Sequence, residues 1–368
     1  MTIEDIALTL SPGVGIKGAV HLLGLFGDAQ QIFAASEEEL VTRAELRREV
    51  AQQLVRRVAF KAAERELAFC TKHDIRAIAS TDDAYPPLLR EIPDYPHILY
   101  IKGAQEALTA RCVSMVGTRE ATPYGQRMCI DLVRGLAERI PNLSVVSGLA
   151  YGIDVACHRA ALAAGAQTVA VLPNPLPNIM PVPHTAVARD ILEAGGALVT
   201  ELHSQVKQKG TFYLARNRII AALSVGTVVV ESPCAGGSLV TAHCADSYNR
   251  TVMAVPGRAT DLASRGANLL IRNKKAQAVL SANDIIEELM WDLNLADCGA
   301  RQSAVLPTLT ADEAGVLGCF RTSDPVSTEE LGELSSLNVG DLSVLLLGLE
   351  MAGAVRQLPG NRYMKMVQ

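Results

Sequence analysis

The sequence predicts an α/β fold: a Rossmann-like parallel sheet core flanked by an N-terminal helical domain and a C-terminal winged-helix domain. Apolar, β-branched runs alternate with helical stretches from residue 111 to about residue 290. These runs stay apolar along their length, which is typical of parallel strands buried on both faces. Residues 1–80 and 308–368 show mainly helical periodicity instead.

The first domain, residues 1–80, is expected to be a bundle of short helices. LSPGVGIKGAVHLLGLFG (10–27) places three glycines in a turn between apolar helical stretches, and residues 37–74 are charged with a helical period. The following segment is too rich in proline for a helix, so residues 81–110 are expected to form an extended linker.

The central domain, residues 111–292, is expected to carry the parallel sheet. Its expected strands, each followed by a helical stretch, are CVSMVG, LSVVSG, QTVAVL, ALVTEL, GTVVVE and TVMAVPG. Ligands of such sheets bind beyond the carboxyl ends of the strands, where the following loops gather. The usual GxGxxG dinucleotide fingerprint does not occur within residues 111–292.

The C-terminal region is expected to begin with a linker, residues 293–307, which has little periodicity. Residues 308–368 then give three helix patterns and a short terminal hairpin. This order predicts a winged helix.

The composition is that of an ordinary globular protein. The chain has 368 residues, 49% hydrophobic and 20% charged, and this balance argues against extensive disorder. The acidic N-terminus and the lack of a long apolar run predict a cytoplasmic protein without a membrane segment. Eight scattered cysteines without a CxxC pair predict reduced thiols and no metal site. No cofactor is expected. A net charge of −5 requires any nucleic-acid surface to be a local basic patch.

Several strand-to-helix turns are suited to bind phosphate, because they present unpaired backbone N–H groups and the positive end of a helix dipole. In VGTR, Gly117 permits close approach of a ligand, Thr118 offers a hydroxyl, and Arg119 offers a planar cation. In VVSGLAYGID, Ser147 and Gly148 leave a strand.

The densest basic and aromatic run is KQKGTFYLARNRIIAALS. Its cations are Lys207, Lys209, Arg216 and Arg218, and Asn217 lies between the two arginines. Phe212 and Tyr213 are candidates for stacking on unpaired bases.

A further glycine-rich turn, GGSLVTAH, makes a tight entry into a helix. Gly237, Ser238 and Thr241 form an anion site that would suit a nucleotide equally well.

Other polar residues of this region are interpreted as structural. Asp154 is expected to cap a helix and His158 to pack within one. Glu201 and Glu231 end strands, but GxSxG, HExxH and Walker sequences do not occur. The sequence therefore predicts a binding protein and no enzyme.

Taken in order, VGTR…YG, VSGLAYGIDVACH, ARNRIIAALS, VVVES…GGSLVTA and AVPG…GANLLI closely resemble the DNA-processing protein A (DprA/Smf) family, across residues 113–272. The flanks loosely resemble that family's SAM-like or helix-hairpin-helix-like domain and its winged helix. The resemblance implies sequence-independent binding of single-stranded DNA and loading of RecA recombinase on incoming strands in natural transformation. It also implies a homodimer formed through the α/β domain.

Carried over by motif, the resemblance assigns phosphate contacts to Arg119, Ser147, Gly148, Arg216, Arg218 and Ser238. It assigns base stacking to Phe212, and one basic contact to Lys207 or Lys209. The chain departs from the family pattern at LPNPLPNIMPVPHT (172–185), where a glycine-rich turn with Tyr-Pro is usual. It departs again at HSQVKQKGTFYLARN, where Pro-Gly and Phe-Pro are usual.

Two alternatives remain. The GGSLVTAH loop and the strand-end glutamates also resemble the LOG nucleotide phosphoribohydrolases, although PCAGGSLVTAH lacks the glutamate of their PGGxGTxxE signature. The winged helix could instead be a module that docks on duplex DNA or protein. Its few basic residues, Arg321, Arg356, Arg362 and Lys365, argue weakly for duplex binding.

Overall fold

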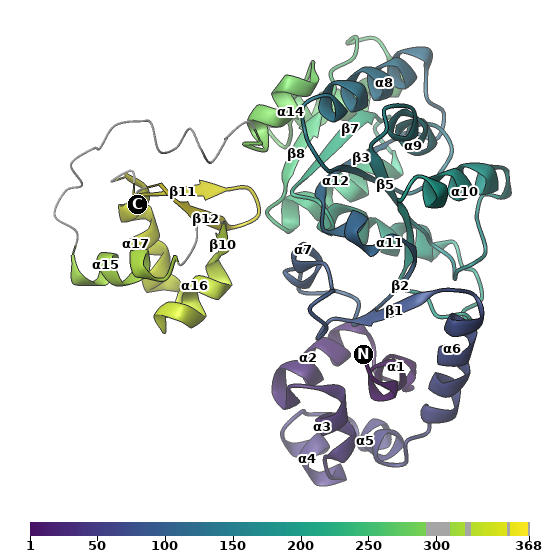
Figure 1. The fold of residues 1–368 in the computed structure, drawn as a ribbon, viewed down its shortest axis with the longest axis vertical. Helices are drawn as coiled ribbons and strands as arrows, with labels where there is room; N and C mark the ends of the chain where they lie inside the picture. The colour runs from purple at the N-terminus through teal and green to yellow at the C-terminus, as the bar shows by residue number, and fades with distance from the viewer. Residues whose placement is uncertain (292–309, 321–324, 352–353, 367–368) are drawn as a thin grey trace.

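The structure is a computed structural model that describes residues 1–291, 310–320, 325–351 and 354–366 (Figure 1). The predicted linker 293–307 lies outside the described residues. The model confirms the predicted α/β class, with N-terminal helices, a large and mainly parallel sheet, and a C-terminal winged helix.

The central sheet has nine strands in the order β1-β2-β6-β5-β4-β3-β7-β8-β9. The strands are β1 Arg76–Ala79, β2 Ile98–Gly103, β3 Arg111–Gly117, β4 Leu143–Ser147, β5 Gln167–Val171, β6 Ala197–Thr200, β7 Gly226–Glu231, β8 Thr251–Ala254 and β9 Gln277–Ala278. All pairings from β6 to β9 are parallel, whereas β2 runs antiparallel to both of its neighbours. The chain builds outward from β3 in one direction as far as β6, and then crosses to β7 on the other side of β3.

The segment expected to be an extended linker, residues 81–110, contributes to the sheet. It contains a short helix α7 (Pro87–Arg90), the strand β2 and a 3-10 turn η1 (Gln105–Leu108). The prolines end before residue 98, and the apolar run that follows them pairs with β6. The high proline content of the segment therefore hid a strand at its end.

Helices cover both faces of the sheet (Figure 1). They are α8 Pro123–Ala137, α9 Ile153–Ala163, α10 Thr185–Glu193, α11 Thr211–Ala222, α12 Gly237–Ser247, α13 Arg265–Arg272 and α14 Ala282–Glu288, with 3-10 turns η2 Val182–His184 and η3 Leu262–Ser264. One buried cluster joins α8, α9 and α14 to Val113 and Met115 of β3. The other joins α11, α12 and α13 to Val116 of the same strand. Alternate residues of β3 thus face opposite layers, as a strand's twofold period requires.

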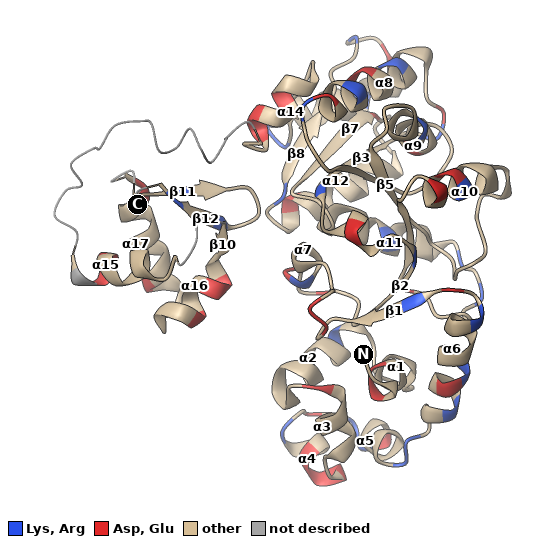
Figure 2. Ribbon diagram, viewed as in Figure 1, with Lys and Arg blue, Asp and Glu red and all other residues tan. Residues whose placement is uncertain are grey.

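Acidic and basic residues are interspersed over the three parts of the chain, as the colours of Figure 2 show. The small net charge of −5 thus reflects a mixture of both signs on each part of the chain.

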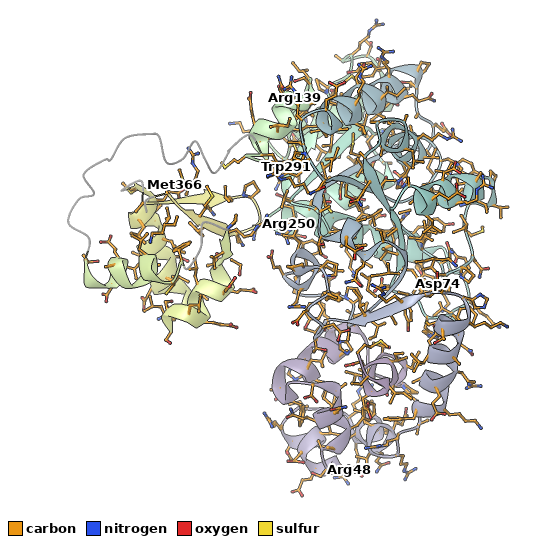
Figure 3. The ribbon with its side chains drawn as sticks, in the orientation of Figure 1. Arg48, Asp74, Arg139, Arg250, Trp291 and Met366 are labelled. Atoms are coloured by element: carbon orange, nitrogen blue, oxygen red, sulfur yellow. The ribbon has the colours of Figure 1, made fainter. Side chains whose placement is uncertain are left out.

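The C-terminal part has its own core and a three-stranded sheet in the order β10-β12-β11. Its elements are α15 Ala311–Gly318, β10 Val326–Ser327, α16 Thr328–Ser335, α17 Val339–Met351, β11 Val355–Leu358 and β12 Arg362–Lys365. A cavity of about 170 Å³ is lined by residues of this part and of the α/β part, among them Arg250, which Figure 3 labels. Among the described residues, no single helix is long and apolar enough to cross a membrane; only α16 and α17 together reach that length, as a pair bent by 106°.

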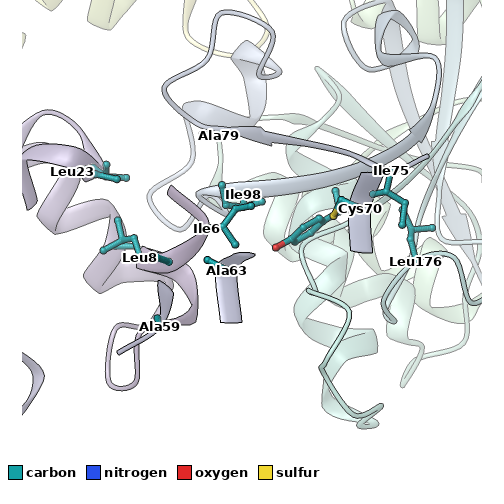
Figure 4. Close-up of a cluster of buried hydrophobic side chains, with 14 of the residues drawn as sticks. Ile6, Leu8, Leu23, Ala59, Ala63, Cys70, Ile75, Ala79, Ile98 and Leu176 are labelled. Atoms are coloured by element: carbon teal, nitrogen blue, oxygen red, sulfur yellow. The ribbon is translucent and has the colours of Figure 1, made fainter. Parts of the chain in front are cut away.

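The N-terminal helices share a hydrophobic core with the central sheet (Figure 4). They are α1 Ile3–Leu10, α2 Ile16–Phe26, α3 Ala29–Ala34, α4 Glu37–Thr42, α5 Arg48–Val55 and α6 Phe60–Lys72. One cluster contains Ile6 of α1 and Ile32 of α3 together with Ile98 and Tyr100 of β2 and Leu198 of β6. The helical domain and the sheet therefore share one continuous hydrophobic core.

Candidate nucleic-acid interface

A hollow of about 270 Å³ opens at the carboxyl ends of β3, β4 and β7. This is where the strand order reverses direction, and open α/β sheets bind ligands at such a point. Its lining residues are Val116, Gly117, Thr118, Arg119, Ala150, Asp154, Tyr213, Leu214, Arg216, Asn217, Ile220, Gly236, Gly237, Ser238 and Thr241. The structure thus brings together eight of the fourteen residues that the sequence selects.

The first wall of the hollow is the end of β3. A Cβ on Gly117 would lie 2.4 Å from Cγ1 of Ile153 and 2.7 Å from the carbonyl oxygen of Glu231, so only glycine fits there. The Thr118 N–H donates to the same Glu231 carbonyl at 2.7 Å, which fixes the turn against β7. Arg119 follows it and is exposed.

Arg119 is held over an aromatic ring. Its guanidinium carbon lies 5.3 Å from the ring centroid of Tyr213 in α11, which is within the range of a cation–π contact. Arg119 is in none of the ion pairs of the described residues. Its charge is therefore available to a phosphate, while the tyrosine ring limits its motion.

One face of α11 forms the floor of the hollow. Tyr213, Arg216, Asn217 and Ile220 all line it, and their spacing of three and four residues places them on one side of a helix. Asn217 Nδ2 donates to the Gly237 carbonyl at 3.3 Å, which ties this floor to the start of α12.

Arg216 is almost fully buried, at 5% exposure, in the floor of the hollow. Its guanidinium donates to the Gly148 carbonyl at 2.7 Å and to the Val171 carbonyl, while its Nε has no partner. Burial lowers the pKa of Arg216 to about 10, and the carboxylate of Asp154 opposes this shift. Arg216 thus remains a cation at neutral pH, and the positive charge it supplies is poorly solvated.

Asp154 was expected to cap α9, but Gly152 occupies the N-cap position and that helix end has no side-chain cap. Asp154 instead lines the hollow and accepts the Ala150 N–H at 3.4 Å. Burial raises its pKa, whereas the Arg216 charge opposes the rise. It offsets part of the buried arginine charge.

The last wall is the N-terminus of α12. Its N-cap residue, Gly236, has no side chain that could accept a hydrogen bond from the first turn. The first N–H groups of this eleven-residue helix are therefore open toward the hollow. The Ser238 hydroxyl donates to the Ser232 hydroxyl at 2.8 Å, and Thr241 is buried one turn further on. The wall supplies backbone donors and a helix dipole to an anion.

The structure places six selected residues outside the lining. Gly148 lies beneath the guanidinium of Arg216, and the buried Ser147 hydroxyl donates to the Met115 carbonyl at 2.7 Å. Arg218 forms ion pairs with Glu201 and, at 3.7 Å, with Asp94.

The other three of these residues lie at or before the start of α11. Lys207 and Lys209 are exposed in the segment before this helix, and Phe212 is half-buried in its first turn. The Ser147 hydroxyl and the Arg218 guanidinium are thus engaged with other parts of the protein, and neither residue lines the hollow.

The sequence indicates Tyr213 only as a stacking candidate beside Phe212, and Asp154 only as a helix cap. The signal that identifies Tyr213 is helical spacing, because it lies three and four residues before Arg216 and Asn217. Phe212, one residue earlier, falls outside that face.

The strand-end glutamates are both engaged. Glu201 pairs with Arg218, and the buried Glu231 accepts the Thr122 N–H at 2.9 Å and the Thr122 hydroxyl at 2.7 Å, at the start of α8. Among the described residues, no three His, Cys, Asp or Glu side chains cluster as metal ligands.

Comparisons with known proteins agree with the sequence resemblance. The model of the family described as DNA recombination-mediator protein A matches residues 76–290, and that of the DprA winged helix domain matches residues 300–361. Protein Smf of Escherichia coli (strain K12) is 34% identical over 307 residues, which cover 82% of this chain and 80% of Smf. A putative DNA processing protein DprA of Mycobacterium tuberculosis is 34% identical over 326 residues, or 85% and 83% of the two chains.

Two solved structures are also similar. DNA processing protein A from Streptococcus pneumoniae has a TM-score of 0.65 at 29% identity and covers 78% of this chain and 98% of its own. DNA processing protein A from Helicobacter pylori, whose structure concerns its single-stranded DNA binding mode, has a TM-score of 0.53 at 27% identity and covers 60% and 97%. Since the first family model spans more than half of the chain, this protein belongs to the family of DNA recombination-mediator protein A, the DprA/Smf family.

Proposed function

We propose that the protein binds single-stranded DNA without sequence preference in the cytoplasm and mediates recombination by loading RecA on incoming strands in natural transformation. The observation that carries the proposal is the hollow at the strand-order reversal, where Arg119, Arg216 and the open start of α12 converge. Membership of the family, and the single-stranded DNA binding of its Helicobacter pylori member, support it.

The chemistry of the hollow suits a phosphate chain and gives no means to identify bases. Backbone N–H groups, a helix dipole and two guanidinium groups recognise phosphate oxygens that every nucleotide shares. An aromatic ring at the same site stacks on any base, because every base has a π-face. The affinity for DNA should therefore depend on the length of exposed, unpaired strand and not on its base sequence.

The test is binding to a labelled oligo-dT strand and to a duplex of equal length, across a salt series. Wild type should prefer the single strand, and Arg119→Ala should lower the salt slope on the single strand by about 0.7 because one phosphate contact is lost. Arg189→Ala, which removes an exposed arginine of α10 paired with Asp190 and Glu193, is the matched control and should change nothing. Equal and weak binding to both DNA forms would reject the proposal.

Loading of RecA and assembly as a homodimer need separate measurements. The rate at which RecA begins DNA-dependent ATP hydrolysis on a pre-coated single strand should rise with wild type and not with Arg119→Ala. Light scattering should give twice the monomer mass of 39.2 kDa.

A nucleotide phosphoribohydrolase is the competing function, because the GGSLVTAH turn would suit a nucleoside monophosphate equally well. Both strand-end glutamates are engaged with other residues, so neither is free to act as its acid or base. Release of free base from a nucleoside monophosphate would favour this alternative over a pure binder.

A duplex-binding role for the winged helix has little support. Helix α17 has the sequence VGDLSVLLLGLEM, without Lys or Arg, and exposes Val344, Leu347 and Met351. Duplex grooves attract positive charge, so this helix is better suited to contact protein.

A further inference from the structure

The N-terminal domain carries a basic surface that the proposed function does not use. The turn from α5 into α6 has the sequence VRRVAFK, residues 55–61, and contains no acidic residue. Arg56, Arg57 and Lys61 are exposed, and none of them belongs to an ion pair among the described residues. We call the set Val55, Arg56, Arg57, Val58 and Lys61 the α5–α6 corner.

The backbone fixes the corner in one conformation. Arg57 has φ 53°, in the left-handed region where glycine is the usual residue after a helix. Its N–H donates to the Leu54 carbonyl at 2.9 Å, and the Val58 N–H donates to the Gln53 carbonyl at 3.2 Å, so the last carbonyls of α5 are satisfied. The Arg57 guanidinium carbon lies 5.0 Å from the ring centroid of Phe60. The cation is thereby held in place.

Further basic residues lie on the neighbouring helices, interspersed with the exposed Glu49 of α5 and Glu64 of α6. Arg65 follows Lys61 by four residues on the same face of α6, and its Nε donates to the Lys61 carbonyl at 3.2 Å. Arg47 and Arg48 lie at the start of α5, where Arg48 pairs with Glu37 at 3.6 Å. Figure 2 shows the basic residues on these helices, and the labelled Arg48 in Figure 3 lies at the end of the domain away from the sheet.

Two apolar side chains lie among these cations. Val55 is 43% exposed and Val58 is 55% exposed, on either side of Arg56 and Arg57. Unpaired cations next to exposed aliphatic groups suit a ligand with both phosphates and apolar faces, and an unpaired DNA strand presents both.

We propose that the α5–α6 corner is a second contact site for the same single strand that the hollow binds. The inference rests on the proposed function, because a strand leaving the hollow carries a phosphate at every nucleotide. A strand long enough to reach from the hollow to the corner is presented there at high effective concentration, so even weak contacts there add to affinity.

The test compares two oligo-dT strands: a short one of about 8 nucleotides, near the site size of one single-strand module, and one several times longer. The variant is Arg56→Ala/Arg57→Gly/Lys61→Ala. Glycine is chosen at position 57 because the left-handed backbone favours it, so the fold is retained. For the long strand the salt slope should fall by about two, since three phosphate contacts are lost at roughly 0.7 each. For the short strand it should not change.

The matched control removes three exposed arginines from α8 and α10, all paired with acids: Arg127→Ala/Arg134→Ala/Arg189→Ala. This control should match wild type on both strands. If the corner variant keeps the wild-type salt slope on the long strand while Arg119→Ala still binds more weakly, the corner is not a DNA contact site. The proposed function of the hollow would then stand. Equal loss on both strand lengths also overturns the corner.

Other ligands give distinct results. Loss of binding to anionic phospholipid vesicles, with DNA binding unchanged, would assign the corner to a membrane surface and reject this proposal. If wild type shows no preference for single strands, the proposed function and the corner fail together.

Discussion

At the scale of single residues, the site depends on how a buried arginine is accommodated. Arg216 packs against the backbone of Gly148 so closely that a Cβ there would lie 2.2 Å from one guanidinium nitrogen and 2.6 Å from the guanidinium carbon. Gly148 therefore acts by leaving room, and its carbonyl accepts from the arginine it admits. The sequence resemblance assigns a phosphate contact to this glycine, whereas the geometry indicates a supporting role.

Gly148→Ala should displace the Arg216 guanidinium and lower both stability and DNA affinity. The overpacking should cost about 1–3 kcal/mol of unfolding free energy, measured by urea titration. Gly24→Ala is the control, because a Cβ at that α2 position meets nothing within 4 Å. That change should stabilise the helix by about 0.5–1 kcal/mol. Unaltered stability and affinity in Gly148→Ala would show that the arginine can move freely.

The two neighbouring aromatic residues at the start of α11 should differ in their effect on DNA binding. Tyr213 lines the hollow and lies under Arg119, whereas Phe212 is outside the lining. Tyr213→Ala should weaken oligo-dT binding by about 1–3 kcal/mol, the range for a stacked base, and Phe212→Ala should cost less. Fluorescence anisotropy with both variants decides between them, and a larger loss from Phe212→Ala would favour the assignment by resemblance.

Residue types could be selected from the sequence, but their partners could not. The positions of Arg119, Gly117 and the GGS turn at the hollow could be predicted, because each follows from its place at the end of a strand. The partners of Arg218 and Ser147 could not be predicted, because Glu201 and the Met115 carbonyl reach them from other elements of the fold. A motif shows what a side chain can do, and the fold decides whether that side chain is already occupied.

At the scale of elements, a buried histidine fastens α9 to the sheet. His158 is fully buried, and its Nδ1 lies 2.7 Å from the Thr168 hydroxyl of β5. That hydroxyl donates to the Val145 carbonyl of β4 at 2.6 Å, so it must accept from the histidine. His158 thus carries its proton on Nδ1, and its Nε2 has no partner. The interpretation of this residue as structural agrees with its position.

The stability of the protein should fall as the pH drops below about 6.5. Burial, with smaller contributions from Arg216 and His184, lowers the pKa of His158 from 6.5 to about 3. Between these values the unfolded chain binds a proton that the folded chain excludes, so the stability contributed at neutral pH is lost toward pH 3. The slope from this group is about 1.4 kcal/mol per pH unit.

Urea titrations from about pH 7 to about pH 5 would measure this slope for wild type and for His158→Gln, which keeps an N–H donor for Thr168. The slope should be smaller in the variant by the contribution of this one group. An identical slope in both proteins would assign the acid sensitivity to other residues.

The order of strands and helices from residue 111 onward could be predicted, because buried parallel strands give continuous apolar runs. The strand β2 could not, because its apolar run follows a proline-rich stretch and pairs with β6, far away in the sequence. Local composition correctly describes residues 81–97 as proline-rich, but it cannot show that the residues after them pair with β6, which lies about a hundred residues further along the chain.

At the scale of the whole molecule, the helical domain and the sheet behave as one body. Their shared cluster joins α1 and α3 to β2, β5 and β6. The buried Asp5 of α1 also lies 3.1 Å from Nε2 of His97, the residue before β2. Packing and a polar contact therefore link the two parts independently of the chain that connects them.

Ile98→Ala should weaken both parts together. Ile98 is 2% exposed in the shared cluster, and truncating a buried isoleucine costs about 2–5 kcal/mol. Hydrogen exchange should show faster opening in α1 and in β4 alike. Loss of protection confined to one of them would show that the two parts unfold separately.

This rigid joint sets the separation between the hollow and the α5–α6 corner. Two contact sites at a fixed separation make binding depend on the length of the strand. A strand too short to span both sites gains no affinity from the second site, whereas a strand just long enough gains the full contribution of that site. Affinity should therefore rise in a step as the strand is lengthened, and that step would measure how much unpaired DNA one copy of the chain requires.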